Sequence, residues 1–145
     1  MSAEELVEKV RAYHPGADGD VIRRAYDFSA RVHKGQKRLS GEPYFVHPVE
    51  VASIIADLRL DVASVATGLL HDTVEDTLTT IAEVEGLFGK EIAELVDGVT
   101  KISQMSFTTR EEKQAENFRK LILAMARDIR VILVKLADRT HNMRT

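Results

Sequence analysis

Apolar residues recur at helical spacing along almost the whole of this 145-residue chain, and this pattern constrains the fold more than any other feature. One clear example follows Asp20, where Ala25, Phe28 and Val32 fall on one face of a helix. Sets of alternating segments that would pair as strands are not evident. The pattern therefore predicts an all-α protein, and the length suits one domain with a sizeable core.

Start and stop signals divide the expected helices. A small helix is expected before Pro15-Gly16. Pro48 suits the first turn of another helix, Asp61 is expected to cap the next, and Thr80 to cap a later one that ends at Gly89. The apolar face of the helix that begins near Pro48 is expected to comprise Val51, Ile54, Ile55 and Leu58.

The last third of the chain is harder to assign. Residues 101–109 are expected to form a loop. Residues 110–126 are expected to form an amphipathic helix through Phe118, Leu121, Ile122 and Met125. The β-branched run from Ile129 to Leu136 fits either a buried strand or a buried helix. Because partner strands are not evident, we favour a central, fully buried helix.

The composition narrows the possible chemistry and location. The chain has no cysteine, which excludes disulfides, thiolate zinc sites and a cysteine nucleophile. No apolar run approaches the roughly 20 residues of a membrane span, and the start is acidic and polar, unlike a signal peptide. We expect a soluble cytoplasmic protein without a membrane partner, in which any metal site uses His, Asp and Glu.

The net charge of −3 hides an uneven distribution. Residues 21–41 carry six basic groups and one acid, whereas residues 57–97 carry ten acids and two basic groups. Residues 98–145 then carry ten basic groups and five acids. Such segments are often solvated helix faces, but they also suit an acidic metal centre with basic walls for a phosphorylated substrate. A nucleic-acid partner is not expected, because such binders are usually basic overall.

The segment from His71 to Asp76, with the sequence HDTVED, carries the strongest chemical signal. Glu75 lies four residues after His71, and Asp76 lies four after Asp72. If the helix from Asp61 continues through this segment, each pair shares a face. Three carboxylates at close range repel one another unless protons or a cation neutralise them. A solvated acidic helix end is the alternative interpretation.

Other metal donors lie elsewhere in the chain. His47 precedes Pro48, although a histidine there is often structural. Asp138 follows the buried run, where Lys135 or Arg139 would suit it as an ion-pair partner. On a helix, Asp138 shares a stripe with Asn142 and Thr145, at i, i+4 and i+7, and His141 lies one position off that stripe.

Together, these residues form a set of two imidazoles and two carboxylates: His47, His71, Asp72 and Asp138. Such a set suits a divalent first-row metal, and manganese, iron and zinc are all compatible. The metal would lower the pKa of a bound water and polarise a phosphoryl oxygen. Glu75 and Asp76 would remain free to orient and deprotonate that water.

The ordered series of motifs resembles the N-terminal hydrolase domain of the bacterial Rel/SpoT alarmone enzymes, which belongs to the HD superfamily of metal-dependent phosphohydrolases. The resemblance runs from about Ala25 to Thr145. Its carriers are Ser40 to Tyr44 with His47-Pro48, His71 to Asp76, Leu87 to Gly89, Gly98 to Lys101, Gln114 to Lys120, and Lys135 to Thr145.

The resemblance implies an all-helical fold and a Mn²⁺-dependent reaction. In that reaction, guanosine 3',5'-bispyrophosphate or its pentaphosphate relative, together (p)ppGpp, loses its 3' pyrophosphate to give GDP or GTP in the stringent response. By this match Mn²⁺ is bound by His47, His71, Asp72 and Asp138, and the attacking water is activated by Glu75 and Asp76. The nucleotide would be contacted by Arg38, Ser40, Asn142 and Thr145.

The chain also departs from its relatives. Leu39 stands where many of them carry a basic residue beside Arg38, which removes one possible substrate contact. The family's full-length enzymes continue into further hydrolase, synthetase and regulatory segments. Residues 1–145 are therefore expected to be a single HD-type hydrolase domain, and an N-terminal fragment of a longer multidomain protein. Truncation at Thr145 would impair an activity that needs contacts beyond it.

Two other functions fit the same residues. The chain could be an HD phosphohydrolase acting on another nucleotide, which the segment from Arg38 to Tyr44 disfavours. It could also be a catalytically incomplete module that binds metal or nucleotide for regulation. The intact pair Glu75-Asp76 disfavours that alternative for the parent protein, though not for a fragment.

Overall fold

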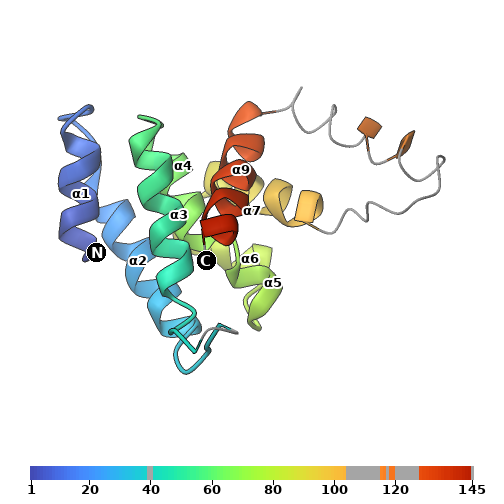
Figure 1. Ribbon diagram of the computed structural model, residues 1–145. Coiled ribbons are helices and arrows are strands. Elements are labelled where there is room, and N and C mark those ends of the chain that lie inside the picture. Colours follow the sequence, from blue (N-terminus) through green and yellow to red (C-terminus); the bar gives the residue numbers. More distant parts are fainter. Residues whose placement is uncertain (39–40, 104–114, 117, 120–127, 145) are drawn as a thin grey trace.

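A computed structural model shows a helical domain, and it describes residues 1–38, 41–103, 115–116, 118–119 and 128–144 (Figure 1). Within these ranges there is no β-strand, only an isolated bridge between Lys37 and Pro43. The helices are α1 (Ala3–Arg11), α2 (Gly19–Val32), α3 (Val46–Asp57), α4 (Val62–Leu70), α5 (Thr73–Asp76), α6 (Ile81–Phe88), α7 (Lys90–Ser103) and α9 (Ile129–Arg144). The predicted all-α class is confirmed. No helix in these ranges is long and apolar enough to cross a bilayer.

Helix α4 lies at the centre and contacts α2, α3, α7 and α9. Its sequence is apolar on every side, as expected for a helix surrounded by others. Gly68 allows α3 to approach closely, because a Cβ added there would lie 2.6 Å from Ile55 Cδ1 and 3.2 Å from Ala52 Cα. Helices α3 and α9, which both contact α4, also pack against each other (Figure 1).

The expected capping residues stand where the helices begin and end. The side chain of Asp61 accepts a hydrogen bond from the backbone N–H of Ser64 at the start of α4. Thr80 caps α6 in the same way through the N–H of Glu83. Gly89 ends α6 with a φ of 94°, a conformation that glycine adopts without steric cost.

The sequence left open whether the helix from Asp61 continues through HDTVED, and it does not: α4 ends at Leu70 and α5 begins at Thr73. Two expectations from the sequence were wrong in detail. Residues 101–103 belong to α7 rather than to a loop. Leu58 lies at the end of α3 and is 52% exposed, whereas Val51 and Ile55 are fully buried.

The run from Ile129 to Leu136 is helical as favoured, but it is not fully buried. Ile129 is 52% exposed and Leu136 is 55% exposed, while Val131 and Val134 face the core. Of the helix expected over residues 110–126, Phe118 is exposed, and Leu121, Ile122 and Met125 lie outside the described residues. Apolar content alone therefore overestimated the burial of this part of the chain.

Candidate metal centre

His47 lies in the first turn of α3. Pro48 follows it inside that turn, where the missing N–H of proline costs no helical hydrogen bond. The side chain of His47 is 3% exposed. Its Nε2 lies 2.7 Å from Asp138 Oδ1 and 3.6 Å from Asp72 Oδ2.

His71 and Asp72 occupy the break between α4 and α5. The Nδ1 of His71 lies 2.6 Å from the carbonyl oxygen of Gly68, so this nitrogen must carry the hydrogen and donate it. A neutral His71 therefore has its lone pair on Nε2, which faces Asp72 and Asp138. The Oδ2 of Asp72 lies 3.0 Å from this Nε2, so the two adjacent residues face the same point.

Asp138 completes the cluster from the middle of α9. Its Oδ1 faces the histidines, and its Oδ2 lies 2.8 Å from the Nζ of Lys135. Lys135 is thus the ion-pair partner, one of the two cations that the sequence offered. The carboxylate is 7% exposed, so the lysine compensates part of the cost of burying it.

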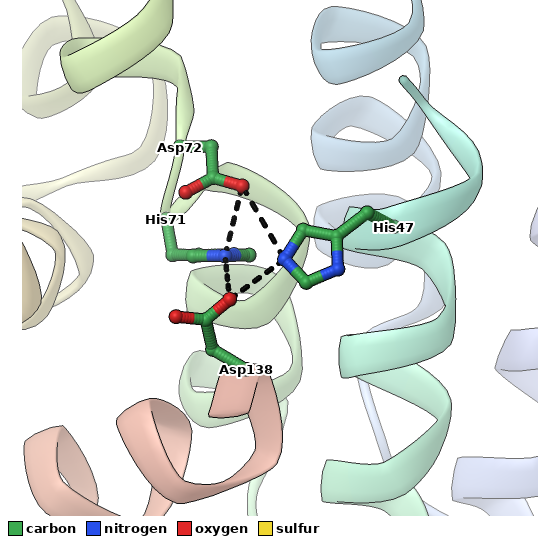
Figure 2. Close-up of side chains that lie close together, drawn as sticks. All are labelled: His47, His71, Asp72 and Asp138. Atoms are coloured by element: carbon green, nitrogen blue, oxygen red, sulfur yellow. Dashed lines mark hydrogen bonds and ion pairs between the residues drawn. The ribbon is translucent and has the colours of Figure 1, made fainter. Parts of the chain in front are cut away.

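The four side chains converge from three separate segments of the chain (Figure 2). One ligand atom from each of His47, His71, Asp72 and Asp138 lies within 4.8 Å of all the others, and all four residues are buried. The Nε2 of His71 lies 3.0 Å from Asp72 Oδ2 and 3.3 Å from Asp138 Oδ1. Ligands of a first-row metal lie about 2.1 Å from the ion, hence about 3 to 4 Å apart. The geometry and donor types therefore fit a divalent metal.

The electrostatics point the same way. Burial alone would lower the pKa of His71, but the charges of Asp72 and Asp138 outweigh it and raise this pKa to about 10. Burial likewise favours the neutral form of Asp138, yet hydrogen bonds and charge from His47, His71 and Lys135 hold its pKa well below the usual range. Two buried carboxylates therefore demand positive charge between them, which a cation supplies as well as a proton does.

Glu75 and Asp76 lie beside this centre on the short helix α5. Both are exposed and line a pocket open to solvent, while Asp72 links them to the buried donors. Partial burial and then the charge of Asp72 raise the pKa of Glu75 above its usual range. The four buried donors do not line this pocket, so the pair adjoins the candidate centre only through Asp72 and is itself exposed to solvent.

The predicted substrate residues fall into two groups. Arg38 and Asn142 are brought together, with Arg38 Nη2 donating to Asn142 Oδ1 over 2.7 Å. The amide of Asn142 also donates to Asp138 Oδ1 over 3.3 Å, which connects these residues to the metal centre. Ser40 and Thr145 lie outside the described residues.

A profile of the HD domain matches residues 25–145, which is most of the chain. The chain belongs to the HD domain family. HD domains are metal-dependent, and the buried His/Asp cluster of this domain is consistent with that property.

Curated relatives support the predicted Rel/SpoT resemblance. A "GTP pyrophosphokinase" of Myxococcus xanthus is 64% identical over 99% of this chain and 19% of its own length. The "Bifunctional (p)ppGpp synthase/hydrolase SpoT" of Escherichia coli K12 is 52% identical over 98% of this chain and 20% of its own length. The chain thus spans about a fifth of the length of these relatives.

A solved structure is also similar. It is described as a metazoan ortholog of SpoT that hydrolyses ppGpp, and it matches with a TM-score of 0.62 and 29% sequence identity. The match covers 83% of this chain and 67% of that one. The predicted HD-superfamily fold is therefore confirmed.

Two residues of this HD domain were not singled out as candidates from the sequence. The hydroxyl of Tyr44 lies 2.8 Å from Asp72 Oδ2 and 2.8 Å from Asp76 Oδ2, so it links the buried centre to the exposed pair. His141 contacts His47. From the sequence, His141 was expected to lie off the stripe of Asp138. His141 and Asn142 follow Asp138 by three and four positions, however, and residues at these two spacings lie on the same helix face. This spacing was the signal that could have identified His141.

Proposed function

We propose that this HD domain hydrolyses the 3' pyrophosphate of (p)ppGpp in a metal-dependent reaction. The observation that carries the proposal is the convergence of four buried metal donors beside the exposed pair Glu75-Asp76. The names of relatives at 52% identity supply the substrate class. The products would be pyrophosphate and GDP or GTP, as water supplies a hydroxyl to phosphorus and a proton to the departing 3' oxygen.

His47, His71, Asp72 and Asp138 would hold the metal, and Mn²⁺ is the ion we propose. Once bound, this cation would acidify a water molecule and draw negative charge from a phosphoryl oxygen. The chain's own residues orient those ligands. Lys135 holds the outer oxygen of Asp138, and the carbonyl of Gly68 fixes the ring of His71.

Glu75 and Asp76 would accept the proton of the attacking water. The raised pKa of Glu75 makes its carboxylate a better base than an ordinary glutamate, and Glu75 lies next to Asp72, one of the proposed metal ligands. Asp76 receives a hydrogen bond from Tyr44, which orients the carboxylate. Arg38 would pack over the guanine base, with Asn142, Ser40 and Thr145 as further nucleotide contacts.

The test is to incubate the chain with Mn²⁺ and each of a panel of nucleotides, and to measure pyrophosphate release. We expect release from (p)ppGpp and its loss in Asp72→Ala and Asp76→Ala. Release mainly from other nucleotides would instead identify a different HD phosphohydrolase. Binding of nucleotide without turnover would indicate a catalytically incomplete module, and full activity in a metal-free preparation would refute the mechanism.

A further inference from the structure

His141 lies directly behind His47, on the side away from the other metal donors. The Nδ1 atoms of the two rings are 2.7 Å apart, and both residues are buried, at 2% exposure for His47 and 6% for His141. The Nε2 of His47 points in the opposite direction, towards Asp138 and Asp72. One imidazole therefore joins His141 to the candidate metal centre.

The two rings meet nearly edge to edge. Their centroids are 4.9 Å apart, which is close to the largest separation that a 2.7 Å contact between the two nitrogens allows, and their planes differ by 25°. A ring N–H lies in the ring plane and points away from the centroid. The geometry is therefore that of a nearly linear hydrogen bond rather than of stacked faces.

Only one hydrogen fits between the two nitrogens, so one ring donates and the other accepts. If His47 donates from Nδ1, its Nε2 carries the lone pair and can bind a cation. If His141 donates instead, a neutral His47 carries its hydrogen on Nε2 and gives it to Asp138 over 2.7 Å. The choice of donor thus decides whether His47 presents a lone pair or a hydrogen to the centre.

We propose that His141 is a positioning residue, which accepts the Nδ1 hydrogen of His47 and so holds the His47 ring as a metal ligand. The inference rests on the proposed metal centre. It assigns to His141 a role like that of the outer hydrogen-bond partners of ligating histidines, whose removal typically costs 10- to 100-fold in metal affinity.

Two substitutions of nearly equal shape separate this role from packing. His141→Asn keeps a carbonyl oxygen at the position of Nδ1, whereas His141→Leu has the same branching but no acceptor. The affinity for Mn²⁺ is measured from the paramagnetic resonance signal of the free ion in titrations of each 145-residue chain. We expect about 10- to 100-fold weaker binding in His141→Leu and recovery of most of that loss in His141→Asn.

A spectroscopic measurement tests the tautomer directly. In the Zn²⁺-loaded wild type, ¹H–¹⁵N spectra of the imidazole nitrogens should show a hydrogen on Nδ1 of His47 and none on Nε2. A hydrogen on Nε2 would overturn the proposal.

Several outcomes of the titration would also overturn it. Equal affinity in His141→Leu and wild type would do so, as would equal loss in the Asn and Leu variants with a matching fall in the melting temperature of the metal-free chain. The last result would show a packing role. If the wild type itself fails to bind Mn²⁺, both the proposed metal centre and the inference are refuted. If the wild type binds Mn²⁺ and His141→Leu binds it equally well, only the inference is refuted, so the two failures are distinguishable.

Discussion

At the residue scale, each of the four candidate metal donors contacts a further polar group, which for His47 is His141. The Gly68 carbonyl holds His71, and Lys135 holds Asp138. The hydroxyl of Tyr44 contacts both Asp72 and Asp76. Because a hydroxyl carries one hydrogen, Tyr44 donates to only one of these two carboxylates at a time. The negative charge of the other carboxylate then needs a positive charge nearby. Tyr44 is therefore placed to align the buried centre with the exposed pair.

Replacing Tyr44 with phenylalanine should impair catalysis without unfolding the domain. Loss of a hydrogen bond to a charged group removes about 1.5 to 3 kcal/mol, which corresponds to roughly 10- to 160-fold in kcat. The measurement is the steady-state rate of pyrophosphate release at saturating Mn²⁺. Tyr26→Phe is the matched control, because the Tyr26 hydroxyl bonds the Met1 carbonyl, away from the site. Equal rates in the two variants would contradict the assigned role of Tyr44.

At the element scale, the central helix α4 depends on its cap and on its close approach to α3. Asp61 caps α4 and also pairs with Arg130 of α9 at 2.6 Å, and the same guanidinium reaches Glu91 of α7 at 2.7 Å. Near the C-terminal end of α4, Gly68 leaves room for the backbone of Ala52. These contacts hold α4, the helix that precedes His71 and Asp72, against α3 and α9, which carry His47 and Asp138.

The contribution of Asp61 should depend on pH. Burial favours its neutral form, but hydrogen bonds from Ser64 and the charge of Arg130 outweigh it and lower its pKa. A lowered pKa means that the stabilisation is present above about pH 4 and is lost as the pH falls through the folded-state value. Asp61→Ala should therefore cost about 1 kcal/mol at pH 7, measured by urea unfolding, and less near pH 3.

The control for this prediction is Asp61→Asn. Asparagine caps helices about as well as aspartate but does not ionise, so Asp61→Asn should keep the cap at pH 7, lose only the ion pair with Arg130, and not add to the acid sensitivity. If Asp61→Ala costs the same at both pH values, the ionised cap contributes nothing.

Filling the space at Gly68 should destabilise the domain. Gly68→Val would force α3 and α4 apart, and overpacking of this kind typically costs about 1 to 3 kcal/mol. Gly86→Ala in α6 is the control, because nothing lies within 4 Å of a Cβ added there. Removing a helical glycine should leave that variant as stable or up to about 1 kcal/mol more stable. Thermal unfolding of the metal-free chains measures both, and an unchanged melting temperature in Gly68→Val would refute the close approach.

At the scale of the whole molecule, the candidate metal centre joins α3, the α4–α5 junction and α9. A ligand that binds only the folded state stabilises that state, and a site shared by three segments forms only when they are packed. The same cluster without a cation holds two buried carboxylates close together, which is costly. Metal binding and stability of the fold are therefore expected to be linked.

Adding Mn²⁺ should raise the melting temperature, and a chelator should reverse the change. At 100 times the dissociation constant the gain is about 2.7 kcal/mol, followed by calorimetry. Asp138→Asn should abolish most of this shift, whatever its effect on the metal-free chain. A shift of the same size in the variant would mean that Mn²⁺ binds elsewhere.

The sequence alone predicted the all-α fold class, the residues that cap the helices, and the imidazole and carboxylate groups of the candidate metal site. Fold class and caps could be predicted because helical periodicity and cap chemistry are local properties. Asp61, Thr80 and Gly89 are examples. The donor types and the motif series also predicted a metal site at His47, His71, Asp72 and Asp138, four residues that the structure brings together.

Only the tertiary structure decided which groups stand behind those donors. His141 and His47 are separated by 94 positions, and Tyr44 and Asp72 by 28, so no local pattern predicts that they touch. The break at His71-Asp72 and the exposure of Leu58 and Leu136 have the same origin. Burial and orientation depend on which helices pack around a segment, and this packing is a property of the folded chain as a whole.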